Sequence, residues 1–141
     1  MRIYQAGPIF TAAEIRWHKD FKKQLADAGY VVQWPGDFFT QQEIDALGAD
    51  AAKVIMERDR AAIDDCDVVV ALLDGVQVDD GTAWEIGYAY AKGKAVVGIR
   101  TDFRNGGDTA HGCVNAMIEG SCVGIAKDFD EVLKLLEPIS E

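Results

Sequence analysis

The sequence predicts an α/β protein with a three-layer, doubly wound fold around a parallel sheet of about five strands. Segments typical of strands alternate with segments typical of helices along the chain, which favours parallel strands joined by helical crossovers. In addition, Asp67–Leu73 contains six apolar residues in a row, a pattern typical of a strand buried on both faces of a parallel sheet. Right-handed crossovers then place helices on both sides of the sheet.

The chain begins with an expected strand over Arg2–Ala6, which ends at a Gly-Pro turn. Thr11 and Glu14 have the spacing of a capping box, so a helix is expected to begin there and to end at Gly29. The alternation then continues. The later elements are expected as a strand over Tyr30–Trp34, a helix over Ala51–Asp65, the strand Asp67–Leu73, a helix over Gly81–Lys92, a strand over Ala95–Ile99, a short helix over Cys113–Glu119, a strand over Cys122–Ile125 and a helix over Asp130–Leu136.

The length and composition narrow the class of protein. The 141 residues show no repeat or linker, so residues 1–141 are expected to form a single domain. With 14 basic and 24 acidic residues, the formal net charge is −10, which argues against nucleic-acid polymers and membrane surfaces as partners. No apolar run approaches the roughly 18 residues of a membrane span, and no signal-peptide pattern opens the chain. Three cysteines fit no disulfide framework, so we expect a cytoplasmic protein.

Doubly wound sheets bind ligands beyond the carboxyl ends of their strands. Three loops are expected to converge there: Gly7–Thr11, Asp74–Thr82 and Arg100–Gly112.

Glu85 is expected in the first turn of the helix that follows the central strand, at the crevice end. A helix N-terminus favours negative charge, so this carboxylate is expected to be ionised. An ionised carboxylate at the mouth of a crevice can attack an electrophilic carbon. The same placement also suits a purely structural role, because acidic residues are common in first turns.

Asp59 lies on the apolar stripe of its expected helix, where a charge must be paired, neutral or facing a pocket. Pairing with Arg58 or Arg60 is the structural alternative. If Asp59, Asp79 and Glu85 gather in one crevice, their repulsion raises at least one pKa. An acid with a raised pKa beside an ionised carboxylate is the pairing that glycosidic-bond chemistry uses.

Other chemical motifs are weak or missing. The chain contains neither GxGxxG nor GxxxxGK[ST], which argues against dinucleotide and P-loop sites. His18 lies on an amphipathic helix and is expected to be solvated. His111 and Cys113 offer two potential metal ligands, fewer than the usual three or four, so no metal site is expected.

Five motifs occur in order along almost the whole chain. They are Ile3–Phe10, Arg58-Asp59, Asp65–Val69, Asp79–Ala89 with Lys92-Gly93-Lys94 after it, and Val114–Met117. Together they resemble the signature of the nucleoside 2-deoxyribosyltransferases. The resemblance implies a flavodoxin-like (Rossmann-like) fold that exchanges the nucleobase on a 2-deoxyribosyl group and needs no cofactor. It also implies deoxynucleosides and free nucleobases as partners, and a homo-oligomer, either a dimer or a hexamer.

The resemblance also implies residue roles. The family's nucleophilic glutamate falls on Glu85 and the tyrosine that orients it on Tyr4. Its base-contacting and proton-donating aspartates fall on Asp59 and Asp79, and which of them protonates the base stays open. The resemblance places substrate contacts at Gly7, Pro8, Phe10, Gly81, Asn115 and Met117, the last two reaching the sugar of a neighbouring subunit.

Two other functions compete with base exchange. A 2′-deoxynucleoside 5′-monophosphate N-glycosidase resembles the same signature. However, Pro8 has no N–H and the chain has only two serines, so donors for a phosphate are few. A receiver-like signalling domain would use Asp74 as phosphoacceptor. It needs an acidic pair after the first strand to hold Mg²⁺, where this chain has Ala6-Gly7-Pro8.

The aromatic residues near the second expected strand leave two readings open. These residues are Trp34, Phe38 and Phe39. Their side chains either stack on a nucleobase or pack in the core.

Overall fold

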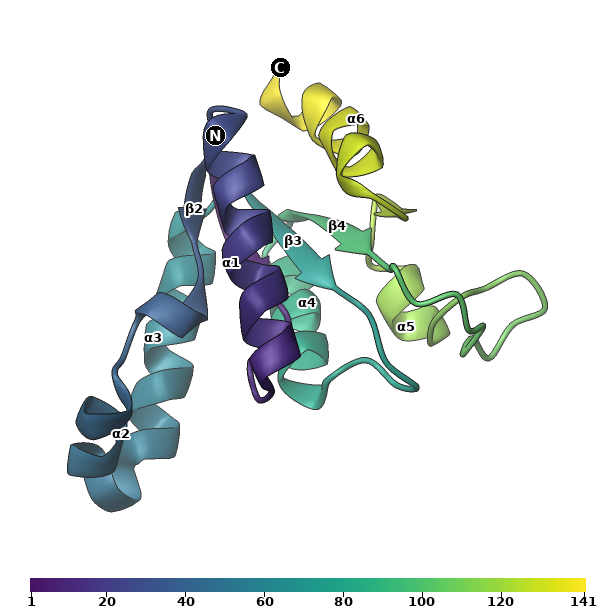
Figure 1. Ribbon diagram of the computed structural model, residues 1–141. Helices are drawn as coiled ribbons and strands as arrows, with labels where there is room; N and C mark the ends of the chain where they lie inside the picture. The colour runs from purple at the N-terminus through teal and green to yellow at the C-terminus, as the bar shows by residue number, and fades with distance from the viewer.

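A five-stranded, all-parallel sheet forms the centre of the structure, a computed structural model that describes residues 1–141 (Figure 1). The strand order is β2-β1-β3-β4-β5, so the winding direction reverses between β1 and β3. The strands are β1 (Arg2–Ala6), β2 (Val31–Gln33), β3 (Val68–Leu72), β4 (Ala95–Ile99) and β5 (Gly124–Ala126). The predicted fold class is confirmed.

Helices cover both faces of the sheet (Figure 1). The first helix, α1 (Ala12–Asp27), and the last, α6 (Phe129–Ser140), pack against one face. On the other face lie α3 (Ala51–Asp65), α4 (Asp80–Ala91) and the short α5 (Ala116–Glu119).

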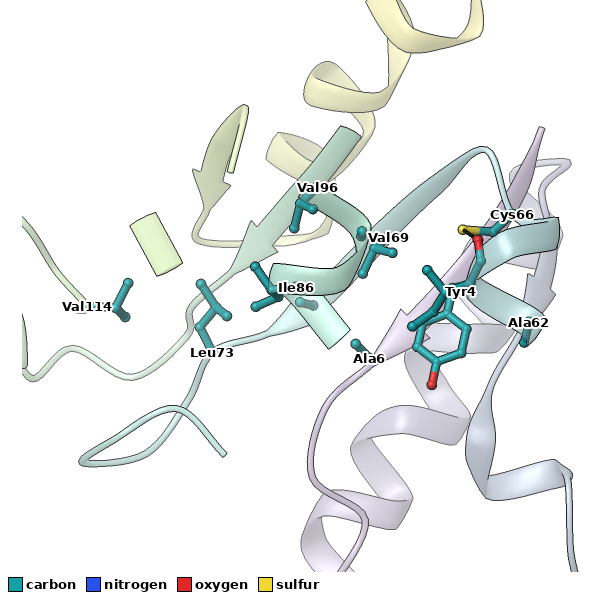
Figure 2. Packing of buried hydrophobic residues seen from close by; sticks show 12 residues of the cluster. Tyr4, Ala6, Ala62, Cys66, Val69, Leu73, Ile86, Val96 and Val114 are labelled. Atoms are coloured by element: carbon teal, nitrogen blue, oxygen red, sulfur yellow. Dashed lines mark hydrogen bonds between the residues drawn. The ribbon is translucent and has the colours of Figure 1, made fainter. Parts of the chain in front are cut away.

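The alternation of side chains along the strands divides the core into two layers. Ile3 and Val68 pack with α1 and α6, whereas Tyr4 and Val69 pack with α3 and α4 (Figure 2). All five residues of β3 are buried, as predicted. Tyr4 therefore lies in the same layer as α4.

Side-chain caps mark where α1 and α4 begin. The predicted capping box between Thr11 and Glu14 is present at the start of α1. Asp79 caps α4, because its Oδ2 accepts hydrogen bonds of 2.9 Å from both the backbone N–H and the hydroxyl of Thr82. This cap fixes Asp79 at the junction between the β3 loop and α4.

One helix, α2 (Gln41–Leu47), was not predicted. It is flanked by 3₁₀ turns at Pro35–Asp37 and Gly48–Asp50. A capping box between Thr40 and Glu43 marks its start, so the same signal used at the first helix could have located it. The helix is too short for a clear helical periodicity.

The prediction that His18 is solvated is wrong. Its side chain is fully buried on α1, between the rings of Trp17 and Trp34. The amide Nε2 of Gln5, on β1, lies 2.9 Å from Nδ1 of His18. Burial lowers the pKa of His18 to about 4, because the interior disfavours the charged imidazolium.

The burial of His18 makes the free energy of unfolding depend on pH. The unfolded chain binds a proton here near the ordinary pKa of 6.5, but the folded chain does so only near pH 4. Stability should therefore fall as the pH decreases from 6.5 to 4, by about 3 kcal/mol from this residue. We expect thermal unfolding at pH 7 and pH 4 to show a larger loss of Tm in the wild type than in His18→Asn. Equal losses in the two proteins would contradict this expectation.

Candidate active site

A pocket of about 610 Å³ opens beyond the carboxyl ends of β1, β2 and β3. Its walls come from the loops after these strands and from α1, α2, α3 and the start of α4. Three carboxylic residues line it together: Asp59, Asp79 and Glu85. The structure therefore places an acidic site at the strand reversal, where doubly wound sheets bind ligands.

Tyr4 donates a hydrogen bond from its hydroxyl to Oε2 of Glu85, across 81 residues of sequence. Tyr4 is fully buried, and its ring lies near Ala6 and Ala62 (Figure 2). Burial and the neighbouring charge of Glu85 raise the pKa of Tyr4 far above its ordinary value. The phenol therefore keeps its proton and orients the Glu85 carboxyl.

The expectation that the helix N-terminus keeps Glu85 ionised is wrong. The helix begins at Asp80, so Glu85 is its sixth residue and lies beyond the first turn, where the effect of the helix dipole has declined. Burial raises the pKa of Glu85 to about 8, despite the hydrogen bond from Tyr4. The charges of Asp59 and Asp79 add to this rise.

Asp59 faces the pocket from α3. Burial raises its pKa to about 6, and Arg58 opposes this rise only in part. The guanidinium of Arg58 lies 3.8 Å above the ring of Phe38, and Arg60 pairs with Asp64. Neither arginine forms a salt bridge with Asp59. The geometry therefore supports the alternative in which the Asp59 carboxyl faces the pocket.

Four substrate contacts were predicted in the first loop and at the start of α4, and three of them lie at the pocket. Gly7, Phe10 and Gly81 line it, whereas Pro8 does not. Phe10 is 78% exposed at the rim. Gly7 has a φ of 149°, a conformation that favours glycine.

One wall of the pocket is apolar. Trp34 and Phe39 in it were among the aromatic residues expected either to stack on a base or to pack in the core, whereas the part that α2 supplies was not predicted. The residues of this wall are Trp34, Phe39, Ile44, Ile55 and Met56. Phe39 and Trp34 therefore line the pocket, while Phe38 packs against the core. Lys19 is the only cationic residue of the lining.

The third predicted loop does not reach this pocket. The segment Arg100–Gly112 lies beside a separate hollow of about 350 Å³, which Asn115 also lines. Asn115 caps α5 by accepting a hydrogen bond of 3.0 Å from the N–H of Met117, and Met117 is 80% exposed. Within one chain, Asn115 and Met117 thus lie outside the pocket that holds Glu85.

Asp74, the alternative phosphoacceptor, ties the loops after β3 and β4 together. Its carboxylate accepts hydrogen bonds from the N–H groups of Thr101 and Asp102 and from the Thr101 hydroxyl. No three His, Cys, Asp or Glu side chains are grouped so that they could hold a metal ion. No helix has the length and apolar character needed to cross a membrane.

The fold and the site together define an α/β protein with an acidic ligand pocket at the strand reversal. The chain belongs to the nucleoside 2-deoxyribosyltransferase family, whose model, described as "Nucleoside 2-deoxyribosyltransferase", matches residues 3–119. The family comprises enzymes that act on N-glycosidic bonds. The predicted resemblance is thereby confirmed.

Two curated relatives match in sequence, and both are uncharacterized proteins. One, from Schizosaccharomyces pombe, is 35% identical over 72% of this chain and 51% of its own length. The other, from Ureaplasma parvum, is 38% identical over 68% of this chain and 63% of its own length. This chain thus spans about half to two thirds of the length of the relatives it matches.

Several solved structures share the fold, among them the three that follow. A conserved protein from Enterococcus faecalis V583 has 27% identity and a TM-score of 0.80, with 98% of both chains covered. A 2-deoxyribosyltransferase from Bacillus psychrosaccharolyticus has 23% identity and a TM-score of 0.75, covering 94% of this chain and 90% of its own. A CMP N-glycosidase from Clostridium botulinum has 23% identity and a TM-score of 0.60, covering 97% and 99%.

Proposed function

We propose that this protein transfers the 2-deoxyribosyl group between nucleobases through a covalent deoxyribosyl–glutamate intermediate. The observation that carries the proposal is the hydrogen bond from Tyr4 to Glu85 in a pocket that also holds Asp59 and Asp79. A carboxylate oriented by a buried hydroxyl can attack C1′ while a neighbouring acid protonates the departing base.

The reaction consists of two displacements. Glu85 attacks C1′ on the face opposite the base, the C1′–N bond breaks, and its electron pair passes to the base nitrogen, which takes a proton from an aspartic acid. A second base then attacks C1′, releases Glu85 and returns a proton to that acid. Two inversions restore the configuration, and water in place of the second base gives slow hydrolysis. Asp59 is the favoured donor, because its pKa is raised to about 6 while Oδ2 of Asp79 caps α4.

Base exchange tests the proposal directly. The protein is incubated with deoxyinosine and adenine, and separately with thymidine and adenine, and the products are separated by chromatography. We expect deoxyadenosine to form in at least one mixture, and Glu85→Gln serves as the inactive control. Exchange in the first mixture alone would mark a purine-restricted enzyme, and exchange in neither would refute the proposal.

The pKa values predict a bell-shaped dependence of kcat/KM on pH. Between about pH 6 and pH 8 the pair carries one proton, which lies mostly on Glu85 because its pKa is the higher of the two. The reactive form is the minor one, in which Asp59 is protonated and Glu85 is ionised. Below about pH 6 both carboxyls are protonated and Glu85 cannot attack, and above about pH 8 both are ionised and no acid remains. We expect the maximum between these values, and Asp59→Asn should lose the alkaline limb. A rate that still rises above pH 9 in the wild type would contradict this assignment.

The same mechanism predicts selectivity for deoxyribose. A 2′-hydroxyl withdraws electrons from the oxocarbenium-like transition state, and it needs room and a partner beside Glu85. We expect kcat/KM for deoxyinosine to exceed that for inosine by about a hundredfold, or ~3 kcal/mol in activation free energy. Equal values for the two nucleosides would contradict the prediction.

A second candidate function is hydrolysis of 2′-deoxynucleoside 5′-monophosphates. It is favoured by Lys19, the cation in the pocket lining, and by the shared fold of the CMP N-glycosidase. Against it, the same lining contains three carboxylic residues, which would repel a phosphate. Comparing the hydrolysis of deoxynucleosides with that of their 5′-monophosphates separates the two functions.

The wider setting is also part of the proposal. Residues 1–141 would act as a single domain within a homo-oligomer, a dimer or a hexamer. Deoxynucleosides and free nucleobases would be its partners in nucleotide salvage in the cytoplasm.

A further inference from the structure

We propose that His18, which does not line the pocket, is a positioning residue that holds two parts of the pocket wall, Gly7 and Trp34, in place for the substrate. This role rests on the proposed function. Gly7 and Trp34 both line the pocket, and the imidazole of His18 packs against both from the buried side.

The approach of His18 to Gly7 leaves no space for a side chain. A Cβ atom on Gly7 would lie 2.5 Å from Cε1 and 2.6 Å from Nε2 of His18, and 3.0 Å from Cβ of Leu72. The backbone of Gly7 therefore packs directly against the imidazole. Because protein interiors are close-packed, a change in the size or position of this ring moves Gly7 and with it the pocket wall.

The imidazole of His18 also packs against Trp34, the second pocket residue that it positions. The rings of His18 and Trp34 are stacked, with centroids 5.8 Å apart and an angle of 21° between the planes. Trp34 is only 3% exposed, so its position depends on the ring behind it. Gly36, which also lines the pocket, packs directly against the indole of Trp34.

Gln5 determines how the imidazole is oriented. Its amide Nε2 lies 2.9 Å from Nδ1 of His18 and donates a bond of the same length to the His18 carbonyl. An amide nitrogen can only donate, so Nδ1 accepts and the ring proton lies on Nε2, on the side of the ring that faces Gly7. Gln5 follows Tyr4 on β1, so this support and the Tyr4–Glu85 bond are anchored in adjacent residues of one strand.

Packing alone does not account for a histidine here. Two buried polar atoms beside the ring have no hydrogen-bond partner, Oε1 of Gln5 and Nε1 of Trp34. Each such atom costs free energy that an apolar side chain of similar size would avoid. The imidazole is therefore better explained by the orientation that it gives to the pocket wall.

Steady-state base exchange with four proteins tests this role: the wild type, His18→Leu, His18→Asn and Lys23→Ala. Leucine fills the space but removes the acceptor, whereas asparagine keeps an oxygen near the position of Nδ1. We expect His18→Leu to raise KM roughly tenfold with kcat within about threefold, because the wall moves while Tyr4 and Glu85 stay in place. His18→Asn keeps the acceptor for Gln5 but lacks the ring atoms beside Gly7 and Trp34, so it should recover only part of the KM. Lys23→Ala, an exposed change on α1, should match the wild type.

An unchanged KM in His18→Leu, or a loss of kcat at unchanged KM, would overturn the proposal. If His18→Leu does not fold, Gln5→Leu removes the same hydrogen bond from the other side and should raise KM likewise. A measurement that does not depend on turnover separates the positioning role of His18 from the proposed base exchange. In ¹⁵N NMR spectra, His18→Leu should shift the Gly7 amide and Trp34 indole signals more than His18→Asn does. Signals that do not move overturn the positioning role. Moving signals in a protein that exchanges no base support the wall contact and refute the proposed function.

Discussion

Replacing Glu85 by glutamine or alanine is expected to reduce base exchange by at least about 10³-fold, the scale of loss when a nucleophile is removed. Glutamine keeps the size of the side chain and can still accept a hydrogen bond from Tyr4, so nucleoside binding should survive. The measurement is the exchange rate, together with the dissociation constant of deoxyinosine by calorimetry. A Glu85→Gln variant with near-normal exchange would remove Glu85 from the mechanism.

The same substitution should stabilise the protein at alkaline pH. Glu85 has a folded pKa of about 8 and an ordinary value of 4.5, so the folded state binds more protons between these values. Wild-type stability therefore falls as the pH rises from 4.5 to 8, and this loss is absent in Glu85→Gln. We expect the variant to unfold at a higher Tm than the wild type at pH 9. A functional group kept at a cost in stability is typical of an active site, whereas a structural cap would show the opposite sign.

Mixing two inactive variants is expected to restore activity if the site is shared between subunits. Asn115 and Met117 lie outside the pocket of their own chain, and the family resemblance assigns them to a neighbour's sugar. In a mixed dimer of Glu85→Gln and Met117→Ala, one site carries both changes and the other carries neither. Equal mixing with full exchange should therefore return about a quarter of wild-type activity.

Met117 is the better residue for this experiment, because it is 80% exposed while Asn115 also caps α5. Asn115→Ala provides the second pairing with Glu85→Gln. Subunit exchange is verified independently by native mass spectrometry. Continued inactivity after confirmed exchange would show that each chain completes its own site.

Local patterns in the sequence were sufficient to predict the framework. The unbroken apolar run in Asp67–Leu73 indicated a central parallel strand, and the Thr11–Glu14 capping box located the first helix correctly. Both signals depend on residues close together in the chain, so they survive without tertiary information. The same signals place Asp79 and Glu85 after the central strand, at the carboxyl edge of the sheet.

Only the tertiary structure decided how the site is built. Burial of Glu85 outweighs the helix dipole and raises its pKa, and burial depends on packing between distant segments. The hydrogen bond from Tyr4 spans 81 residues, and the wall supplied by α2 depends on how that short helix docks against α3. His18 was placed in solvent from its residue type, yet it is buried because Gln5 and Gly7 at the end of β1 and Trp34 after β2 enclose it. A sequence pattern reports which face of an element is apolar, but the local dielectric and the partners of a polar group are set by what packs against that face.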